Sequence, residues 1–239
     1  MFGKNKITKK EKEADGSLNV NSMFYTIQGE GPNAGEPAYF IRLQGCNLRC
    51  TFCDTSFDDG MPMTVTEIIQ KVLGTHVYSW AKPPLIVITG GEPMLQADLP
   101  DLVGKFLERG FRVQIETAGT VWQKGLEADA IYNSDAFQIV CSPKTGKLNP
   151  LLEKRLTAYK YVLREGCVDP TDGLPSHSPE TGKELTLHRP QMHDLPIYVM
   201  PCDEHDDELT QLNEQACVRS AMNFGYTICL QVHKHLGVE

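Results

Sequence analysis

Three cysteines fall within eight residues, as Cys46, Cys50 and Cys53 in a C-x3-C-x2-C spacing. Thiolates are the usual protein ligands of iron–sulfur clusters. Three of them can hold three irons of a four-iron cubane, which leaves the fourth iron open to a small molecule. A structural zinc site needs a fourth Cys or His nearby, whereas the next candidates are His76 and Cys141. A zinc site and chemically inert thiols remain the alternatives to a cluster.

The composition is that of an acidic globular protein. Its 239 residues carry a formal net charge of −8, and 41% are hydrophobic, which fits one α/β domain with a sizeable core. No segment reaches the roughly 20 apolar residues of a membrane-spanning helix. Outside a lysine-rich N-terminus there is no basic stripe to attract a phosphate backbone, so we expect a small-molecule substrate and no direct nucleic-acid partner. Eight cysteines without a signal-peptide core indicate a reducing cytoplasm.

Strand-like and helix-like segments alternate along the chain and predict how the cysteines are positioned. The apolar run 85–89 is typical of a buried parallel strand, and the segment 64–74 begins with a capping-box sequence. This alternation favours a parallel sheet with helical crossovers, so we expect an α/β fold, a partial (β/α)6-type TIM-like barrel with modified helix content. The expected strands are 38–44, 85–89, 111–116, 136–141, 158–163, 196–200 and 226–231, and the expected helices are 64–74, 99–110 and 207–224.

Two segments stand outside this alternation. Residues 1–20 are polar and predict a flexible tail, whereas residues 21–239 predict a single domain. Within that domain, residues 164–195 carry four prolines and three glycines with little apolar periodicity, which predicts a loop-rich insertion. Both a solvent-exposed insertion and a lid over a site fit this segment.

Polar motifs follow the predicted strands at the ends where β/α folds build their active sites. They are Thr-Gly-Gly-Glu-Pro at 89–93, Glu-Thr at 116–117, Ser-Pro-Lys at 142–144 and Met-Pro-Cys-Asp at 200–203. Each motif alone is commonly a tight turn or a helix start. Their shared location points to a binding site, because glycines admit a ligand to the backbone and Glu92 suits an ammonium group. The hydroxyl and carboxylate groups at 116–117 and 142 suit a ribose or a carboxylate.

The cysteine run followed by Gly-Gly-Glu-Pro resembles the radical S-adenosylmethionine (SAM) superfamily. In that superfamily the open iron binds the amino and carboxylate groups of SAM, and reductive cleavage gives methionine and a 5′-deoxyadenosyl radical. A more specific resemblance is to the 7-carboxy-7-deazaguanine synthase family. It rests on FYTIQGEG at 24–31, FIRLQGCN at 40–47, Cys-Asp-Thr at 53–55, ETAGT at 116–120, Ser-Pro-Lys at 142–144 and QVHK at 231–234.

The resemblance implies an activity with three cofactors. The family converts 6-carboxy-5,6,7,8-tetrahydropterin to 7-carboxy-7-deazaguanine with loss of ammonia, in the synthesis of queuosine and other deazapurines. The implied cofactors are a [4Fe–4S] cluster, SAM and Mg²⁺, with the adenosyl radical removing hydrogen from C6 and SAM being regenerated. The implied partners are a flavodoxin-like or other reductant and a second copy of the chain in a homodimer.

Carried over to this sequence, the resemblance assigns site residues in four groups. Cys46, Cys50 and Cys53 would hold the cluster, and Thr55, otherwise an ordinary turn hydroxyl, would bind magnesium. Arg42 lies on a mostly apolar strand and would pair with the substrate carboxylate, a structural carboxylate being the alternative. The other substrate residues would be Ile27, Gln28, Gly29, Thr89, His233 and Glu239, although His233 also fits a plain surface position. The SAM residues would be Gly90, Gly91, Glu92, Glu116, Ser142, Pro143, Lys144, Met200, Pro201, Cys202 and Asp203.

Two features leave other functions open. Met200 stands where the family often has glutamine, so a side-chain contact to SAM would be lost or replaced by backbone. The insertion 164–195 is not explained by the motifs. The alternatives are another radical SAM enzyme, such as a glycyl-radical activating enzyme, and a non-catalytic iron–sulfur or zinc module. Neither gives Gln28 and Thr55 a substrate or magnesium role.

Overall fold

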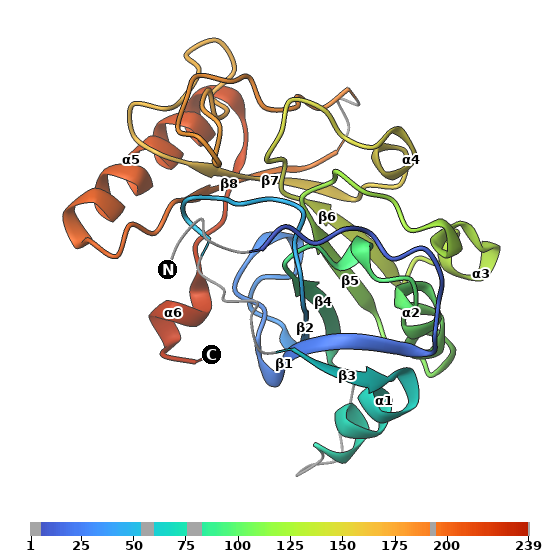
Figure 1. Ribbon diagram of the computed structural model, residues 1–239. Helices are drawn as coiled ribbons and strands as arrows, with labels where there is room; N and C mark the ends of the chain where they lie inside the picture. Colours follow the sequence, from blue (N-terminus) through green and yellow to red (C-terminus); the bar gives the residue numbers. More distant parts are fainter. Residues whose placement is uncertain (1–5, 54–59, 76–82, 192–194, 239) are drawn as a thin grey trace.

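A single nine-stranded sheet organises the chain in the computed structural model, which describes residues 6–53, 60–75, 83–191 and 195–238 (Figure 1). The strand order is β3-β1-β2-β4-β5-β6-β7-β8-β9. The strands are β1 (Ser17–Ile27), β2 (Pro37–Leu43), β3 (Met61–Thr64), β4 (Leu85–Gly90), β5 (Val113–Thr117), β6 (Phe137–Cys141), β7 (Ala158–Leu163), β8 (Ile197–Pro201) and β9 (Thr227–Ile228). From β2 to β9 all neighbours pair in parallel, whereas β1 pairs with β2 and β3 antiparallel. Since β3 and β9 are the two edges, the sheet is an open, curved one, and the prediction of a partial barrel is confirmed.

The helices connect the strands unevenly. They are α1 (Val65–Gly74), α2 (Leu99–Glu108), α3 (Asp129–Tyr132), α4 (Pro150–Glu153), α5 (Asp207–Phe224) and α6 (Val232–Leu236), with 3-10 turns at Gly31–Asn33, Pro93–Leu95 and Lys124–Glu127. The predicted capping box forms at α1, where Thr64 and Glu67 each accept a backbone N–H from the other. α5 ends as predicted, at Gly225 with φ 76°. α3 and α4 are single turns, and no helix occurs between β7 and β8 in the described residues, so the helix content is reduced relative to a full barrel.

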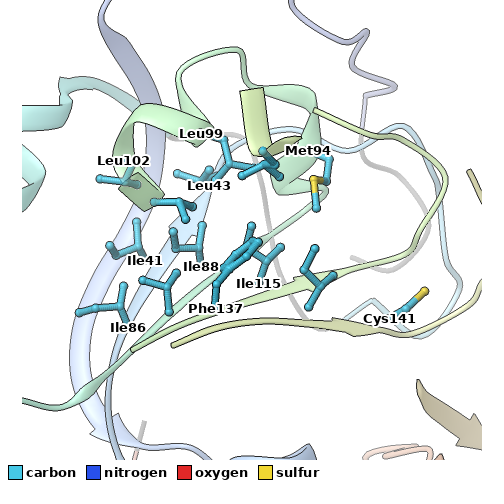
Figure 2. Close-up of a cluster of buried hydrophobic side chains, with 14 of the residues drawn as sticks. Ile41, Leu43, Ile86, Ile88, Met94, Leu99, Leu102, Ile115, Phe137 and Cys141 are labelled. Carbon is cyan, nitrogen blue, oxygen red and sulfur yellow. The ribbon is translucent and has the colours of Figure 1, made fainter. Parts of the chain in front are cut away.

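The main core lies between the outer face of the sheet and its helices. Alternate residues of the parallel strands face outward, and Figure 2 shows them gathered against α2 and the turn before it. They include Ile41, Leu43, Ile86, Ile88, Ile115 and Phe137 from the sheet, with Met94, Leu99 and Leu102 opposite. All of these side chains are at most 1% exposed. This apolar face fixes the register of the strands, because a one-residue slip would turn every core side chain inward.

The inner face of the same strands carries polar side chains. β2 contributes Arg42, β4 Thr89, β5 both Gln114 and Glu116, and β7 Lys160. Arg42, Gln114 and Lys160 each lie between two neighbours that belong to the outer core. Gln114 is fully buried and Lys160 is 5% exposed. Because buried polar groups are costly unless they are hydrogen bonded, this face must hold either an internal network or a ligand.

The N-terminal residues differ from the expected flexible tail over 1–20. β1 already begins at Ser17, and its Leu18 is fully buried. Before it, the Thr8 N–H donates to the Cys46 carbonyl at 2.8 Å and the Glu11 N–H to the Leu95 carbonyl at 2.8 Å. The start of β1 was not predicted as a strand because its two apolar residues, Leu18 and Val20, lie between polar ones. The described residues 6–16 lie against the cysteine loop and the turn after β4.

Two further segments refine the predictions. The expected strand 226–231 reduces to Thr227–Ile228, because the chain turns after Cys229 into α6. The described part of 164–195 contains isolated bridges but no helix or strand, and it packs on α5 and on the cysteine loop, where Pro179 accepts the Thr51 N–H at 2.7 Å. No helix within the described ranges is both long and apolar enough to cross a membrane.

Candidate active site

A cavity of about 250 Å³ opens at the carboxyl ends of the parallel strands and brings most of the predicted site residues together. Its walls include Ile27, Gln28, Arg42, Cys46, Cys50, Cys53, Thr89, Gly90, Gly91, Glu116, Ser142, Lys144, Met200, Pro201, Cys202, Asp203 and His233. Gly29, Glu92 and Pro143 do not line it. The predicted positions Thr55 and Glu239 lie outside the described residues.

The three predicted cluster cysteines all line this cavity. Cys46, Cys50 and Cys53 are half-buried and form no disulfide. Burial raises the pKa of Cys46 to about 12 and that of Cys50 to about 11, so in the absence of iron both thiols stay protonated. No three His, Cys, Asp or Glu side chains among the described residues converge on a position for one metal ion. In a four-iron cubane each thiolate binds a different iron, so the cysteine sulfurs surround the cluster and do not converge on one metal position. Three cysteines without a fourth Cys or His ligand therefore fit a cluster better than a zinc ion.

Close backbone packing positions the cysteine loop over the end of β4. A side chain at Gly91 would overlap the Gly45 carbonyl, and one at Gly90, which has φ +134°, would overlap backbone atoms of Leu43. The Glu92 N–H donates to the Gly45 carbonyl at 2.9 Å. The two glycines therefore serve first to let the β2 and β4 loops touch, which places Cys46 beside the β4 terminus.

Phe52, between the second and third cysteines, is held by two cations. Lys144 Nζ lies 5.5 Å and the Arg164 guanidinium 5.4 Å from the centre of its ring. Lys144 also donates to Ser142 Oγ at 2.5 Å. Burial lowers the pKa of Lys144, although the neighbouring Cys50 opposes this shift. These contacts place two positive groups next to the predicted cluster ligands.

Glu92 has a different role from the predicted contact with an ammonium group. Its carboxylate is fully buried and accepts hydrogen bonds from the Thr117 hydroxyl at 2.8 Å, the Met94 N–H at 3.0 Å and the Ala118 N–H at 2.9 Å. Burial raises its pKa to about 7. It thus joins the loops after β4 and β5 from behind the cavity wall. The Glu92 side chain does not line the cavity, so its contact with an ammonium group stays a prediction from the motif.

The predicted substrate residues form a separate polar group in the cavity wall, which we call the polar end. Gln28 Nε2 donates to Glu116 Oε1 at 3.1 Å, and the Thr89 hydroxyl donates to Glu116 Oε2 at 3.4 Å. The Arg42 guanidinium lies 5.4 Å from the centre of the Phe24 ring. Glu116, predicted among the SAM residues, therefore lies with the residues predicted for the substrate.

Three further polar residues at this end were missed from the sequence. Lys160 forms an ion pair with Glu30 and lies 3.7 Å from Glu116, and Gln231 Nε2 donates to Glu30 Oε1 at 2.8 Å. Glu30 and Gln231 lie inside motifs that were noted only for their resemblance. Lys160 had a visible signal, since it interrupts the otherwise apolar strand 158–163.

The end of β8 and the residues after it close the remaining wall. Met200 and Cys202 are buried there, and Arg164 Nε donates to Cys202 Sγ at 3.3 Å. Asp203 forms an ion pair with Lys234 of α6. With Met200 in place of glutamine, this wall presents a thioether to the cavity. None of the described residues of 165–191 lines the cavity, so this part of the insertion supports the cysteine loop from outside.

Comparisons with known proteins agree with this geometry. The profile of the radical SAM superfamily matches residues 40–168. The chain is 40% identical to the 7-carboxy-7-deazaguanine synthase of Rhodospirillum rubrum over 100% of both chains, and 38% identical to that of Rickettsia prowazekii over 100% of this chain and 96% of the relative. The fold resembles the crystal structure of QueE from Escherichia coli with a TM-score of 0.61 and 22% identity, over 90% of this chain and 93% of that one. The chain thus belongs to the radical SAM superfamily and, within it, to the 7-carboxy-7-deazaguanine synthase family.

Proposed function

We propose that this protein converts 6-carboxy-5,6,7,8-tetrahydropterin to 7-carboxy-7-deazaguanine and ammonia, in queuosine and other 7-deazapurine synthesis. The observation that carries the proposal is that one cavity has in its walls both the three cysteines and the polar group that contains Gln28, Arg42 and Thr89. A radical generated beside the cysteines would be delivered directly to a ligand at the polar end. The names of the full-length relatives support the choice of reaction.

Cys46, Cys50 and Cys53 would hold the [4Fe–4S] cluster, with SAM on the open iron. When bound, these two groups supply the 5′-deoxyadenosyl radical that takes a hydrogen atom from C6 of the substrate. Lys144 and Ser142 offer a cation and a hydroxyl beside the cysteines for the charged and ribose parts of SAM. The backbone at Gly90 and Gly91 lines the same wall.

The polar end would orient the pterin. Arg42 matches the substrate carboxylate, because a guanidinium binds a carboxylate through two parallel hydrogen bonds. The stacked rings of Phe24 and Phe40, with centres 5.3 Å apart, form an apolar wall beside it. Gln28, Thr89 and His233 would complete the pocket with hydrogen bonds.

Magnesium binding is assigned to Thr55, which lies outside the described residues. Mg²⁺ prefers oxygen ligands and retains several waters, so a hydroxyl and the substrate carboxylate are suitable partners. The proposal also includes a flavodoxin-like or other one-electron reductant, a homodimer and a cytoplasmic location.

The test is anaerobic reconstitution with iron and sulfide, followed by assay with SAM, dithionite, Mg²⁺ and the carboxytetrahydropterin. Mass spectrometry should show 7-carboxy-7-deazaguanine with one ammonia per product and without stoichiometric consumption of SAM. A protein that cleaves SAM but forms no product would contradict the substrate assignment and leave the superfamily assignment intact. A radical formed on an added partner protein would instead favour a glycyl-radical activating enzyme.

A further inference from the structure

Lys160 lies inside the cavity with no role in the arrangement described so far. It is at the middle of β7 and is 5% exposed, while its neighbours Tyr159 and Tyr161 belong to the outer apolar core. Its Nζ forms an ion pair with Glu30 and lies 3.7 Å from Glu116 Oε1. We call Lys160 and these two carboxylates the triad. Burial of an ammonium group is costly, and here two carboxylates offset the cost.

The two carboxylates reach Lys160 from separate elements. Glu30 follows β1 and also accepts a hydrogen bond from Gln231, whereas Glu116 belongs to β5 and accepts hydrogen bonds at 3.1 Å from Gln28 and from Gln114. An ionised carboxylate offers about four acceptor positions. Glu116 accepts both glutamines at Oε1 and the Thr89 hydroxyl at Oε2, so it keeps one acceptor position, on Oε2, whereas Glu30 keeps one on each oxygen. Both carboxylates line the cavity.

Lys160 and Glu30 remain charged at neutral pH. Burial opposes the charge on Lys160, but Glu116 and Glu30 outweigh burial and raise its pKa. The same pairing lowers the pKa of Glu30 to about 2 in spite of its burial. The other titratable groups that face the triad are Lys144, His233 and Cys229.

The triad and Arg42 give the cavity two chemically opposite sides. Arg42 is the register partner of Thr89 on the neighbouring strand, and the Thr89 hydroxyl reaches Glu116 on the next strand. Three adjacent strands thus carry a cation, a hydroxyl and a carboxylate in that order. A ligand that matches them has a carboxylate at one end and N–H donors at the other. A purely structural ion pair can often be replaced by apolar residues without loss of stability. The triad instead lines an open cavity, and this position points to a ligand.

We infer that Lys160 is a positioning residue that fixes Glu30 and Glu116 as acceptors for the N–H groups of a 2-amino-4-oxopyrimidine ring. This inference rests on the proposed function, because the carboxytetrahydropterin carries that ring opposite its carboxylate. The ring N–H and the adjacent amino group form two parallel donors, which suit the two oxygens of one carboxylate. Lys160 acts through the carboxylates and does not itself touch the substrate.

The experiment compares the reconstituted parent with Lys160→Met, Lys160→Arg and the control Lys105→Met, which removes an exposed lysine–carboxylate pair on α2. For Lys160→Met we expect KM for the carboxytetrahydropterin to rise roughly tenfold to a hundredfold, the effect of losing a charge-assisted hydrogen bond. The acid limb of its kcat/KM profile should move to higher pH by about one unit or more, since the carboxylates lose their counter-charge. Lys160→Arg should restore the acid limb, because it keeps the charge. Lys105→Met should match the parent.

Loss of thermal stability with unchanged KM and pH profile would overturn the inference and make the triad structural only. If Lys160→Met does not fold, the double variant Lys160→Met with Glu30→Gln keeps the same net charge and should show the raised KM. An unchanged KM in that variant would also overturn the inference. A parent that cleaves SAM but makes no product would overturn both the proposed function and this inference, whereas an active parent with unaffected variants overturns only the inference.

Discussion

Gly29 packs directly against the imidazole of His233, so closely that a side-chain carbon on Gly29 would overlap the ring. The Val232 N–H donates to the Gly29 carbonyl at 3.1 Å, and this bond fixes the start of α6 against the end of β1. Gly29 was predicted to contact substrate, whereas the structure gives it an indirect role. Its missing side chain lets His233 reach the cavity wall.

Gly29→Ala should therefore displace His233 and raise KM for the pterin substrate about tenfold, the cost of roughly one hydrogen bond. Cluster content should stay unchanged, because the atoms that an added side chain would meet belong to His233 and not to the cysteine loop. The control is Gly74→Ala, in the exposed last turn of α1 with open space around it, which should leave KM unchanged. Steady-state kinetics on both variants checks this, and an unaltered KM for Gly29→Ala would contradict it.

Replacing any one of Cys46, Cys50 or Cys53 with alanine should abolish stable cluster binding, because two thiolates cannot hold the three irons. Iron and sulfide analysis after anaerobic reconstitution, with the visible absorption of the cluster, measures this. Cys217→Ala is the matched control, since Cys217 is a free, buried thiol on α5 that does not line the cavity. Equal iron loss in the control, or full iron content in a loop variant, would contradict the assignment.

Glu92→Gln should lower the free energy of unfolding by about 1–3 kcal/mol. Its two oxygens accept the backbone N–H groups of Met94 and Ala118, so an amide NH₂ in either position would face a donor. Glu67→Gln on α1 is the control, because only Oε2 of Glu67 accepts hydrogen bonds and the amide oxygen can replace it. Urea unfolding of both variants measures the difference, and equal stabilities would rule out Glu92 as the link between the two loops.

Thr55→Ala should weaken the dependence of the rate on Mg²⁺. The hydroxyl is the proposed protein ligand, so more magnesium should be needed for half-maximal activity. Titration of the metal in the product assay measures this shift, and Thr51→Ala, two residues before Cys53, serves as a nearby hydroxyl control. An identical magnesium titration for Thr55→Ala and the parent would exclude Thr55 as the ligand.

Glu30 should make folding stability depend on pH in the acid range. Its pKa in the folded state, about 2, lies below the ordinary value of 4.5, so ionisation favours the folded state. This contribution is complete above about pH 4.5 and is lost as the pH falls toward about 2. The free energy of unfolding, measured at successive pH values through that window, should change less with pH for Glu30→Gln than for the parent. Parallel pH dependences would contradict the ion pair with Lys160.

The parallel strands and α1, α2 and α5 were predictable because each follows a local apolar period. The strand expected at 85–89 is observed as Leu85–Gly90, and the helix expected at 207–224 as Asp207–Phe224. β1 escaped prediction because its first half has only two apolar residues, Leu18 and Val20, each between polar ones. The length of β9 was overestimated because its pairing with β8 stops at Ile228, although the residues that follow favour a strand. The same limit applies to the site.

Motifs located the cavity residues, but a motif does not show which way a side chain points. Glu92 follows β4 and Glu116 lies near the end of the neighbouring strand β5, yet Glu92 is buried behind the cavity wall and Glu116 lines the cavity. Lys160 gains its partners from positions 130 and 44 residues away in the sequence, Glu30 and Glu116, so no local pattern could pair them.

The contact between Gly29 and α6 also has a consequence for folding of the chain. Gly29 and Val232 are 203 residues apart in the sequence, yet their hydrogen bond holds His233 in the cavity wall. Contacts between residues far apart in the sequence cost more loop-closure entropy than local contacts. We therefore expect this part of the wall to form later in folding than the hydrogen-bonded pairing of neighbouring strands such as β4 and β5.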